Sequence, residues 1–211
     1  MLHNYVFADI NEALPKLAEE ILTYGSEDES RAGKTKELIH VGVTLTDPLR
    51  RETVLLNRKG SLAAQIAETM WVLSGRDDVE WLSHYLPRAK DFSDNGTTWR
   101  GAYGKRIRAW DGGSNRKPVD QLRWVVSHLA KEPSSRRAVI SIYDPMLDQY
   151  PGKDIPCNDW LDFKIRNGYL YLHVAVRSND LIWGWSGINA FEWSALLEIV
   201  AELLGVQVGN L

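Results

Sequence analysis

Residues 161–176 read LDFKIRNGYLYLHVAV, and this stretch decides the fold class. Leu161, Phe163 and Ile165 alternate with charged residues before Asn167-Gly168, and apolar residues alternate with polar or aromatic ones after it. Because successive side chains of a strand point to opposite faces, this pattern predicts two strands with one face toward a core. Asn-Gly favours a two-residue turn, so the sequence predicts a β-hairpin.

Apolar periodicity and end signals predict the elements around this hairpin. Helices are expected over residues 9–23, 61–75, 119–132 and 191–205, and further strands over 38–43, 52–57 and 136–144. Polar composition predicts a loop over 25–37, and the richness of 84–119 in Gly, Asn, Asp and aromatics predicts a long functional loop. Without a linker or a repeat, we expect a single domain over 1–211.

Composition narrows the class of protein. The chain has 211 residues, 44% of them hydrophobic, and a formal net charge of -3. This balance disfavours nucleic-acid binding, because no overall basic field is available. The apolar runs are too short to cross a bilayer and the first residues lack a signal peptide's pattern, so we expect no membrane association and a cytoplasmic location. With one cysteine, neither an internal disulfide nor a multi-thiolate metal site is possible, and we expect no metal.

Several residues are candidates for chemistry. Cys157 lies in IPCND, before the hairpin, and is either a small buried hydrophobe or a reactive thiol. Glu68 lies within an apolar helix and needs a partner or a function. The remaining candidates share a context that suits either an anion or plain solvation: Arg31, Arg136, Arg137, Arg177 and Ser178.

Six segments resemble the thymidylate synthase family. EPSSRRAVISIYDP is similar to its SRR strand, PCN to its nucleophile loop and YLYLHVAVRSNDLIWG to its Arg-Ser-x-Asp segment, with the family's spacing kept between Cys157 and Arg177. QIAETMWVLSGRDDVEWL resembles the helix with the family's essential glutamate. AYGKRIRAW resembles its YGxxWRxW segment, and ESRAGKT its arginine loop. The matches cover nearly the whole chain and imply an α+β fold, with a mixed sheet packed with helices and one sheet face at a dimer interface.

The resemblance also implies a mechanism. Cys157 would attack C6 of a pyrimidine nucleotide, so that C5 captures a one-carbon unit from 5,10-methylenetetrahydrofolate. Glu68 would organise the water that moves protons on the ring and the folate, and Tyr103 would support removal of the C5 proton.

The same resemblance assigns the binding residues. Arg31, Arg177 and Ser178 would hold the 5'-phosphate, while Arg136 and Arg137 would reach the phosphate of a neighbouring subunit. This implies an obligate homodimer with shared active sites. Asp180 matches the aspartate that binds the pterin ring, and Asn189 is our candidate for reading the base.

Departures from the family pattern favour another product than thymidylate. Asn158 replaces a histidine near O4 of the base, and an amide can pair with cytosine as well as with uracil. The family's IWxxWA corresponds to RAKDFSD here, so a tryptophan that packs over the intermediate is replaced around Ala89 and Lys90. Water would then compete with hydride transfer and leave a hydroxymethyl group.

GWSGINAFEWSALL is two residues longer than the family's corresponding segment, and the sequence ends at VQVGNL, before the family's HxYxxH segment. That sugar-binding part lies outside this sequence, or the sugar site is built differently. We therefore expect a pyrimidine nucleotide 5-hydroxymethylase acting on CMP or dCMP, similar to the cytidylate enzymes of nucleoside-antibiotic pathways such as mildiomycin biosynthesis. A divergent thymidylate synthase and an inactive nucleotide- or RNA-binding homologue remain the alternatives.

Overall fold

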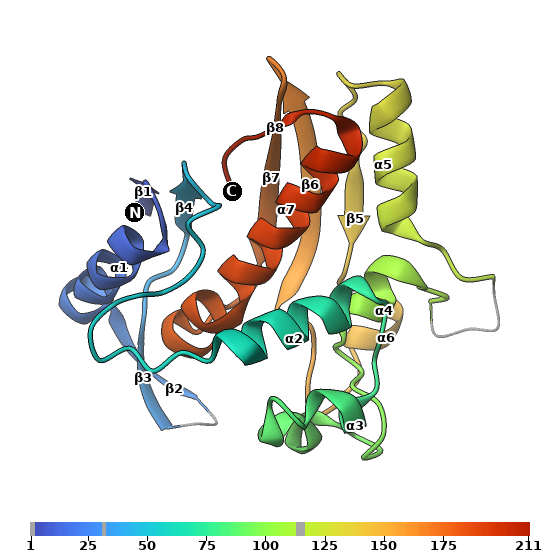
Figure 1. The fold of residues 1–211 in the computed structure, drawn as a ribbon. Helices are drawn as coiled ribbons and strands as arrows, with labels where there is room; N and C mark the ends of the chain where they lie inside the picture. The colour runs from blue at the N-terminus through green and yellow to red at the C-terminus, as the bar shows by residue number, and fades with distance from the viewer. Residues whose placement is uncertain (1–2, 31–32, 113–116) are drawn as a thin grey trace.

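A four-stranded mixed sheet forms the centre of the computed structural model, which describes residues 3–30, 33–112 and 117–211. Its strands are β5 (Val139–Ser141), β6 (Asn158–Arg166), β7 (Tyr169–Val176) and β8 (Gln207–Val208), side by side in this order. β5, β6 and β7 are antiparallel, and β8 runs parallel to β7. With the helices packed against this sheet, the α+β class is confirmed (Figure 1).

The hairpin of β6 and β7 is confirmed where the sequence predicted it. Ile165 pairs with Leu170 across the turn, and Asn167 and Gly168 take φ values of 52° and 81°, as this tight turn requires. The face turned to the core is built by Leu161, Phe163, Leu170 and Leu172, all at most 1% exposed. β6 leads directly out of Cys157, so the hairpin fixes the position of that residue.

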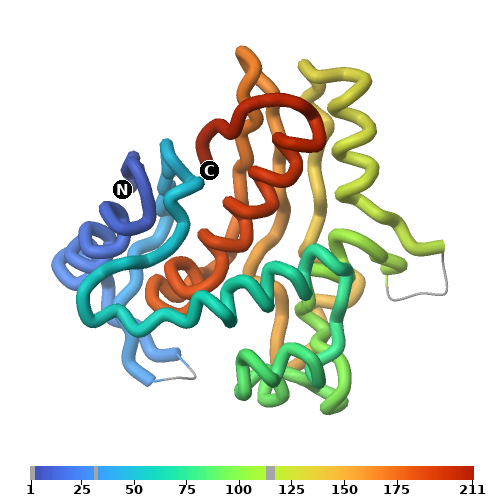
Figure 2. The backbone as a smooth tube through the Cα atoms, viewed as in Figure 1, coloured from blue at the N-terminus to red at the C-terminus, as the bar shows by residue number. Residues whose placement is uncertain are grey.

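The four long helices are also confirmed. They are α1 (Ile10–Tyr24), α2 (Leu62–Leu73), α5 (Gln121–Lys131) and α7 (Ala190–Leu204). Side chains of Asp9, Ser61 and Asp120 accept backbone N–H groups at the starts of α1, α2 and α5. α7 lies across the sheet, and its first turns meet α2 (Figures 1 and 2).

Two predictions on the N-terminal part were wrong. Residues 52–57 form no strand, and Val54 and Leu56 are 72% and 91% exposed. Residues 25–37 are not a loop but contain the exposed strands β2 (Ser26–Ser30) and β3 (Gly33–Glu37). Their register places Glu27 opposite Lys36 and Glu29 opposite Lys34, so pairs of opposite charge compensate for the missing apolar face.

A small parallel sheet completes this region. It pairs β1 (His3–Phe7) with β4 (Val41–Leu45). β1 was not predicted, and the bounds of β4 are shifted by two to three residues toward the C-terminus from the predicted strand over 38–43. Among the described residues, no helix combines the length and apolar character needed to cross a membrane.

The predicted loop 84–119 contains short helices as well as turns. It includes η1 (Pro87–Phe92) and α4 (Tyr103–Arg108), and it follows α3 (Val79–Leu82). Gly104 lets α4 approach α2, because a Cβ there would lie 2.7 Å from the carbonyl oxygen of Val72.

A buried ion pair holds α4 against the segment before Cys157. The Arg106 guanidinium binds both carboxylate oxygens of Asp148, at the end of α6 (Pro145–Asp148), and the carbonyl of Ile142 at 2.7 Å. The side chains of Arg106 and Asp148 are at most 1% exposed. Breaking such a pair by removing one partner costs about 3–5 kcal/mol, so the pair fixes Tyr103 relative to the nucleophile loop.

Candidate active site

Cys157 lies at the end of the loop that enters β6, half-buried and not in a disulfide. The bulge between Asn158 and Trp160 interrupts the ladder immediately after it. Arg177 and Ser178, which follow β7, lie beside its sulfur: Arg177 Nη2 is 3.7 Å and Ser178 Oγ is 3.9 Å from Sγ. Both side chains can donate hydrogen bonds to an anion that lies beside the sulfur. The structure thus brings these three residues together.

Arg177 also supports the backbone of the nucleophile loop. Its Nε donates to the carbonyl of Pro156 and its Nη2 to that of Ile155, each at 2.9 Å. Its own backbone N–H donates to the carbonyl of Cys157 at 2.9 Å. The side chain therefore lies beside the Cys157 sulfur and is also part of what holds Cys157 in place.

Arg177→Ala is expected to raise the KM for the nucleotide and to lower kcat, each by roughly 10-fold or more, because charged hydrogen bonds contribute about 1.5–3 kcal/mol. The lower kcat follows from the loosened Ile155–Pro156 backbone. Steady-state kinetics beside a Ser178→Ala control, which keeps both backbone contacts, separates the two effects. A KM equal to that of the wild type would remove Arg177 from the nucleotide site.

Tyr103 begins α4 and points toward the same centre. Its ring packs on Trp193 at a centroid distance of 5.6 Å. Burial and the negative charges of Cys157 and Glu192 raise the pKa of Tyr103, while the nearby Asn158 amide opposes the rise. The phenol therefore stays protonated and can donate a hydrogen bond beside the nucleophile.

Asn158 is fully buried, and Trp193 determines how its amide is oriented. Trp193 Nε1, which can only donate, lies 3.2 Å from Asn158 Oδ1. The amide oxygen thus accepts the hydrogen bond of the indole, and Nδ2 points away from Trp193. Nδ2 makes no hydrogen bond of standard geometry with a described residue. An unpaired buried donor is expected to meet a ligand or water.

Two carboxyl groups lie deeper in the site. Glu68 is on α2, where burial raises the pKa of its carboxyl to about 7. Glu192 is in the first turn of α7 and is 1% exposed. Burial, and then the charge of Glu68, raise the pKa of Glu192 well above its ordinary value. The sequence analysis missed Glu192 and Trp193, although a glutamate in an otherwise apolar helix is the signal that pointed to Glu68.

Asp180 precedes a nine-residue π-helix, η2 (Leu181–Asn189), and Asn189 is its last residue. Asn189 is half-buried, and its amide lies near enough to Glu192 to oppose the rise in that carboxyl's pKa. Asp180 is exposed and its Oδ1 accepts the backbone N–H groups of Ile182 and Trp183 at 2.9 and 2.5 Å. Both bonds use Oδ1, so Oδ2 of this exposed carboxylate can still accept from a ligand.

The other predicted phosphate ligands are not brought to Cys157. Arg136 and Arg137 are exposed and precede β5, whose Val139 pairs with Asp162, well along β6 from the nucleophile. Arg137 forms an ion pair with Glu132 at 3.7 Å. Arg31 lies outside the described residues.

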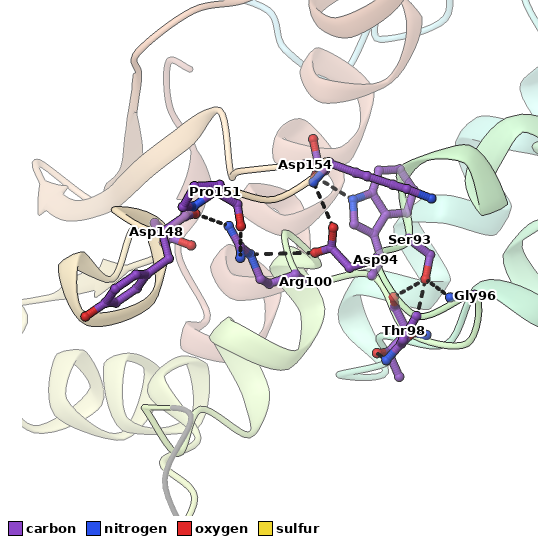
Figure 3. Close-up of polar contacts among 12 residues, drawn as sticks. Ser93, Asp94, Gly96, Thr98, Arg100, Asp148, Pro151 and Asp154 are labelled. Atoms are coloured by element: carbon purple, nitrogen blue, oxygen red, sulfur yellow. Dashed lines mark hydrogen bonds and ion pairs between the residues drawn. The ribbon is translucent and has the colours of Figure 1, made fainter.

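The segment 93–100 is tied to the loop that carries Cys157. Arg100 donates to the carbonyls of Tyr150 and Pro151 at 2.7 and 3.1 Å, and Asp94 accepts the backbone N–H of Lys153 at 2.8 Å (Figure 3). These contacts hold the two loops together beside the site.

The aromatic residues of this region differ from the expected pattern. Trp99 donates to Asp154 at 2.5 Å and stacks on Phe92. Ala89 is 2% exposed within the main core, whereas Lys90, next to it, is exposed, and the replacement of a tryptophan at these positions stays a prediction.

The comparisons with known proteins agree with this geometry. The thymidylate synthase family model matches residues 13–211, and the chain belongs to that family. Members of this family take their one-carbon unit from 5,10-methylenetetrahydrofolate.

Named relatives point to a subgroup. The chain is 41% identical over 186 residues to a deoxyuridylate hydroxymethyltransferase of Bacillus phage SP01, covering 85% of this chain and 49% of the relative. It is 35% identical over 198 residues to one of Delftia phage PhiW-14, covering 88% and 53%. A putative thymidylate synthase of Methanothermobacter thermautotrophicus is 30% identical over 213 residues, covering 100% and 90%. The chain thus spans about half the length of the hydroxymethyltransferases that it matches.

Proposed function

We propose that this chain forms the catalytic core of a folate-dependent pyrimidine nucleotide 5-hydroxymethyltransferase, and that its substrate is dUMP. The reaction class is supported by the surroundings of the Cys157 sulfur. Arg177 and Ser178 lie beside it, and Tyr103 is near enough for the charge of Cys157 to act on it. The choice of a hydroxymethyl product is supported by the names of the phage relatives.

The Asn158 amide supports uracil as the base. With Oδ1 bound to Trp193, the group that Asn158 can offer to a ligand is the Nδ2 donor, which makes no hydrogen bond of standard geometry and lies near the Tyr103 hydroxyl. O4 of uracil accepts a hydrogen bond, whereas the amino group at C4 of cytosine donates and would face another donor. The cytidylate specificity inferred from sequence stays a prediction, and this orientation weighs against it.

The site residues divide the work as follows. Cys157 Sγ attacks C6, which makes C5 nucleophilic, and the Tyr103 hydroxyl assists removal of the C5 proton. Arg177 and Ser178 hold the phosphate and keep it beside the nucleophile. Glu68 accepts and returns protons through water, and Asp180 and Glu68 line the folate side. The folate supplies the one-carbon unit, and attack of water on the transferred carbon gives the hydroxymethyl group.

The family's shared-site homodimer is also part of this proposal. Arg136 and Arg137 lie far along the sheet from their own Cys157, which agrees with a role at a second copy's phosphate. The sheet face opposite α7 exposes Val139, Trp160 and Tyr169 at 40–42%, which suits burial against that copy.

A panel of dUMP, UMP, dCMP and CMP tests the substrate. Each nucleotide is incubated with 5,10-methylenetetrahydrofolate, and the mass of its product is measured by mass spectrometry. We expect dUMP to react fastest and to gain CH2O. Turnover of the cytidine nucleotides alone would reject uracil as the base.

Asn158→Asp tests the reason for the preference. Aspartate keeps the contact with Trp193 but replaces the Nδ2 donor by an acceptor. We expect the ratio of kcat/KM for dCMP to that for dUMP to rise by roughly 10-fold or more, the cost of about one mismatched hydrogen bond. Asn158→Gln is a size control in which this ratio should change little. An unchanged ratio in the aspartate variant would show that Asn158 does not read the base.

A further inference from the structure

Glu192 is a buried acid that the reaction described above does not use. It is 1% exposed, and among the described residues neither Oε1 nor Oε2 makes a hydrogen bond of standard geometry, although the Asn189 amide lies nearby. An unpaired carboxylate in such a place is costly, and an apolar side chain of the same size would pack there without this cost. A buried carboxyl group at this position therefore suggests a role in the chemistry of the site rather than in packing.

The fold places this acid behind Glu68. α7 packs on α2 at its first turns (Figure 2), and Gln65 of α2 donates to the carbonyl of Gly187 at 2.8 Å, in η2 just before α7. Glu68 keeps some contact with solvent, whereas Glu192 has almost none. Glu68 is thus the member of the pair that can exchange protons with solvent, whereas Glu192 is enclosed and acts on Tyr103.

The groups that face Glu192 come from three elements. They are Glu68 on α2, Tyr103 on α4 and Asn189 at the end of η2. Within the described ranges, none of the groups that act on Glu192 is a cation, so nothing there stabilises two negative charges. Burial raises the pKa values of both carboxyls, and the charge of Glu68 raises that of Glu192 further. Two buried carboxyls whose charges act on each other, with no cation to balance them, favour a state with one proton between them.

We infer that Glu192 is the proton-holding partner of Glu68: the two carboxyls share a proton at neutral pH, and Glu192 returns it to Glu68 during turnover. The inference rests on the proposed hydroxymethyl transfer for its role in catalysis, but the shared proton itself belongs to the protein without substrates.

The proton balance of the reaction gives this pair a purpose. Hydroxymethyl transfer removes a proton from C5 and another from the attacking water, and the released tetrahydrofolate takes up both on nitrogen. The site must therefore accept and donate protons at the same pH. A lone carboxyl is either an acid or a base at any moment, whereas a pair with one shared proton offers both forms.

The first test is the pH dependence of kcat in Glu192→Gln at saturating substrates. Below pH 7, Glu68 is still protonated and the variant should work within a few-fold of the wild type. Above this value, the variant has no acid left, and its deficit should grow by about 10-fold per pH unit while KM stays unchanged. Ser194→Ala, another 1% exposed polar position of the same helix, should run parallel to the wild type. A constant ratio of Glu192→Gln to wild type at all pH values would mean that Glu192 only fills space.

The second test needs no substrate. Infrared difference spectra of the free protein between pH 6 and pH 9 should show a protonated carboxyl in a dry environment that persists above pH 8 in the wild type. We expect this band to be lost in Glu192→Gln and, should that variant not fold, in Glu192→Leu. Persistence of the band in both would overturn the inference, whatever the nucleotide products are. Conversely, a methyl product would reject the proposed function and leave the shared proton standing.

Discussion

Cys157→Ala is expected to lower turnover by at least roughly ten-thousand-fold, because attack of the thiolate on C6 precedes every later step. Release of tritium from dUMP labelled at C5 should fall equally, since C5 becomes reactive only after this attack. Nucleotide binding should change only a few-fold, because Arg177 and Ser178 are still present.

Calorimetric titration and tritium release measure these two effects separately. Cys157→Ser is the matched control for side-chain shape. Its turnover should be nearly as low as that of Cys157→Ala, and its affinity for the nucleotide should equal that of the wild type. Tritium release by Cys157→Ala at the rate of the wild type would reject covalent catalysis.

Glu68→Gln is expected to lower kcat by roughly 10²–10⁴-fold and to stabilise the protein above pH 7. Burial raises the folded-state pKa of Glu68 from 4.5 to about 7, so the folded protein binds more protons than the unfolded chain between these values. Wild-type stability therefore falls as pH rises through this window, by up to about 3 kcal/mol. Glutamine is neutral at every pH, so the free energy of unfolding of the variant does not fall over this window.

Urea unfolding at pH 5 and pH 8 measures the difference. The variant should gain little at pH 5 and most at pH 8, whereas the exposed Glu80→Gln should show no such trend. An equal effect at both pH values would mean that Glu68 is not held in its neutral form, and would weaken its role in proton transfer.

Local patterns in the sequence predicted the centre of the fold. The alternation about Asn167-Gly168 needs only neighbouring residues to form a hairpin, and the capped apolar stretches of α1, α2, α5 and α7 likewise carry their own signals. Residues 52–57 look like a strand by composition, but no partner strand covers Val54 and Leu56, and their exposure follows from that. Pairing with a partner is a property of the whole fold, which a local pattern does not contain.

The candidate site divides in the same way. Cys157, Arg177 and Ser178 are joined by the two ends of one hairpin, so their sequence spacing was enough to place them together. The role of Asn158 could not be read in this manner, because Trp193 lies 35 residues away and orients the amide from another element. Glu192 required the packing of α7 on α2 to become visible as the neighbour of Glu68.

The most direct test of the account is the origin of the new oxygen when the enzyme turns over dUMP and 5,10-methylenetetrahydrofolate in water labelled with the heavy oxygen isotope. Mass spectrometry of the nucleotide and the absorbance of dihydrofolate are followed in the same reaction. The account predicts a product that gains CH2O with the labelled oxygen, and no accumulation of dihydrofolate. A product that gains only CH2, with dihydrofolate formed in equal amount, would contradict it and identify a thymidylate synthase.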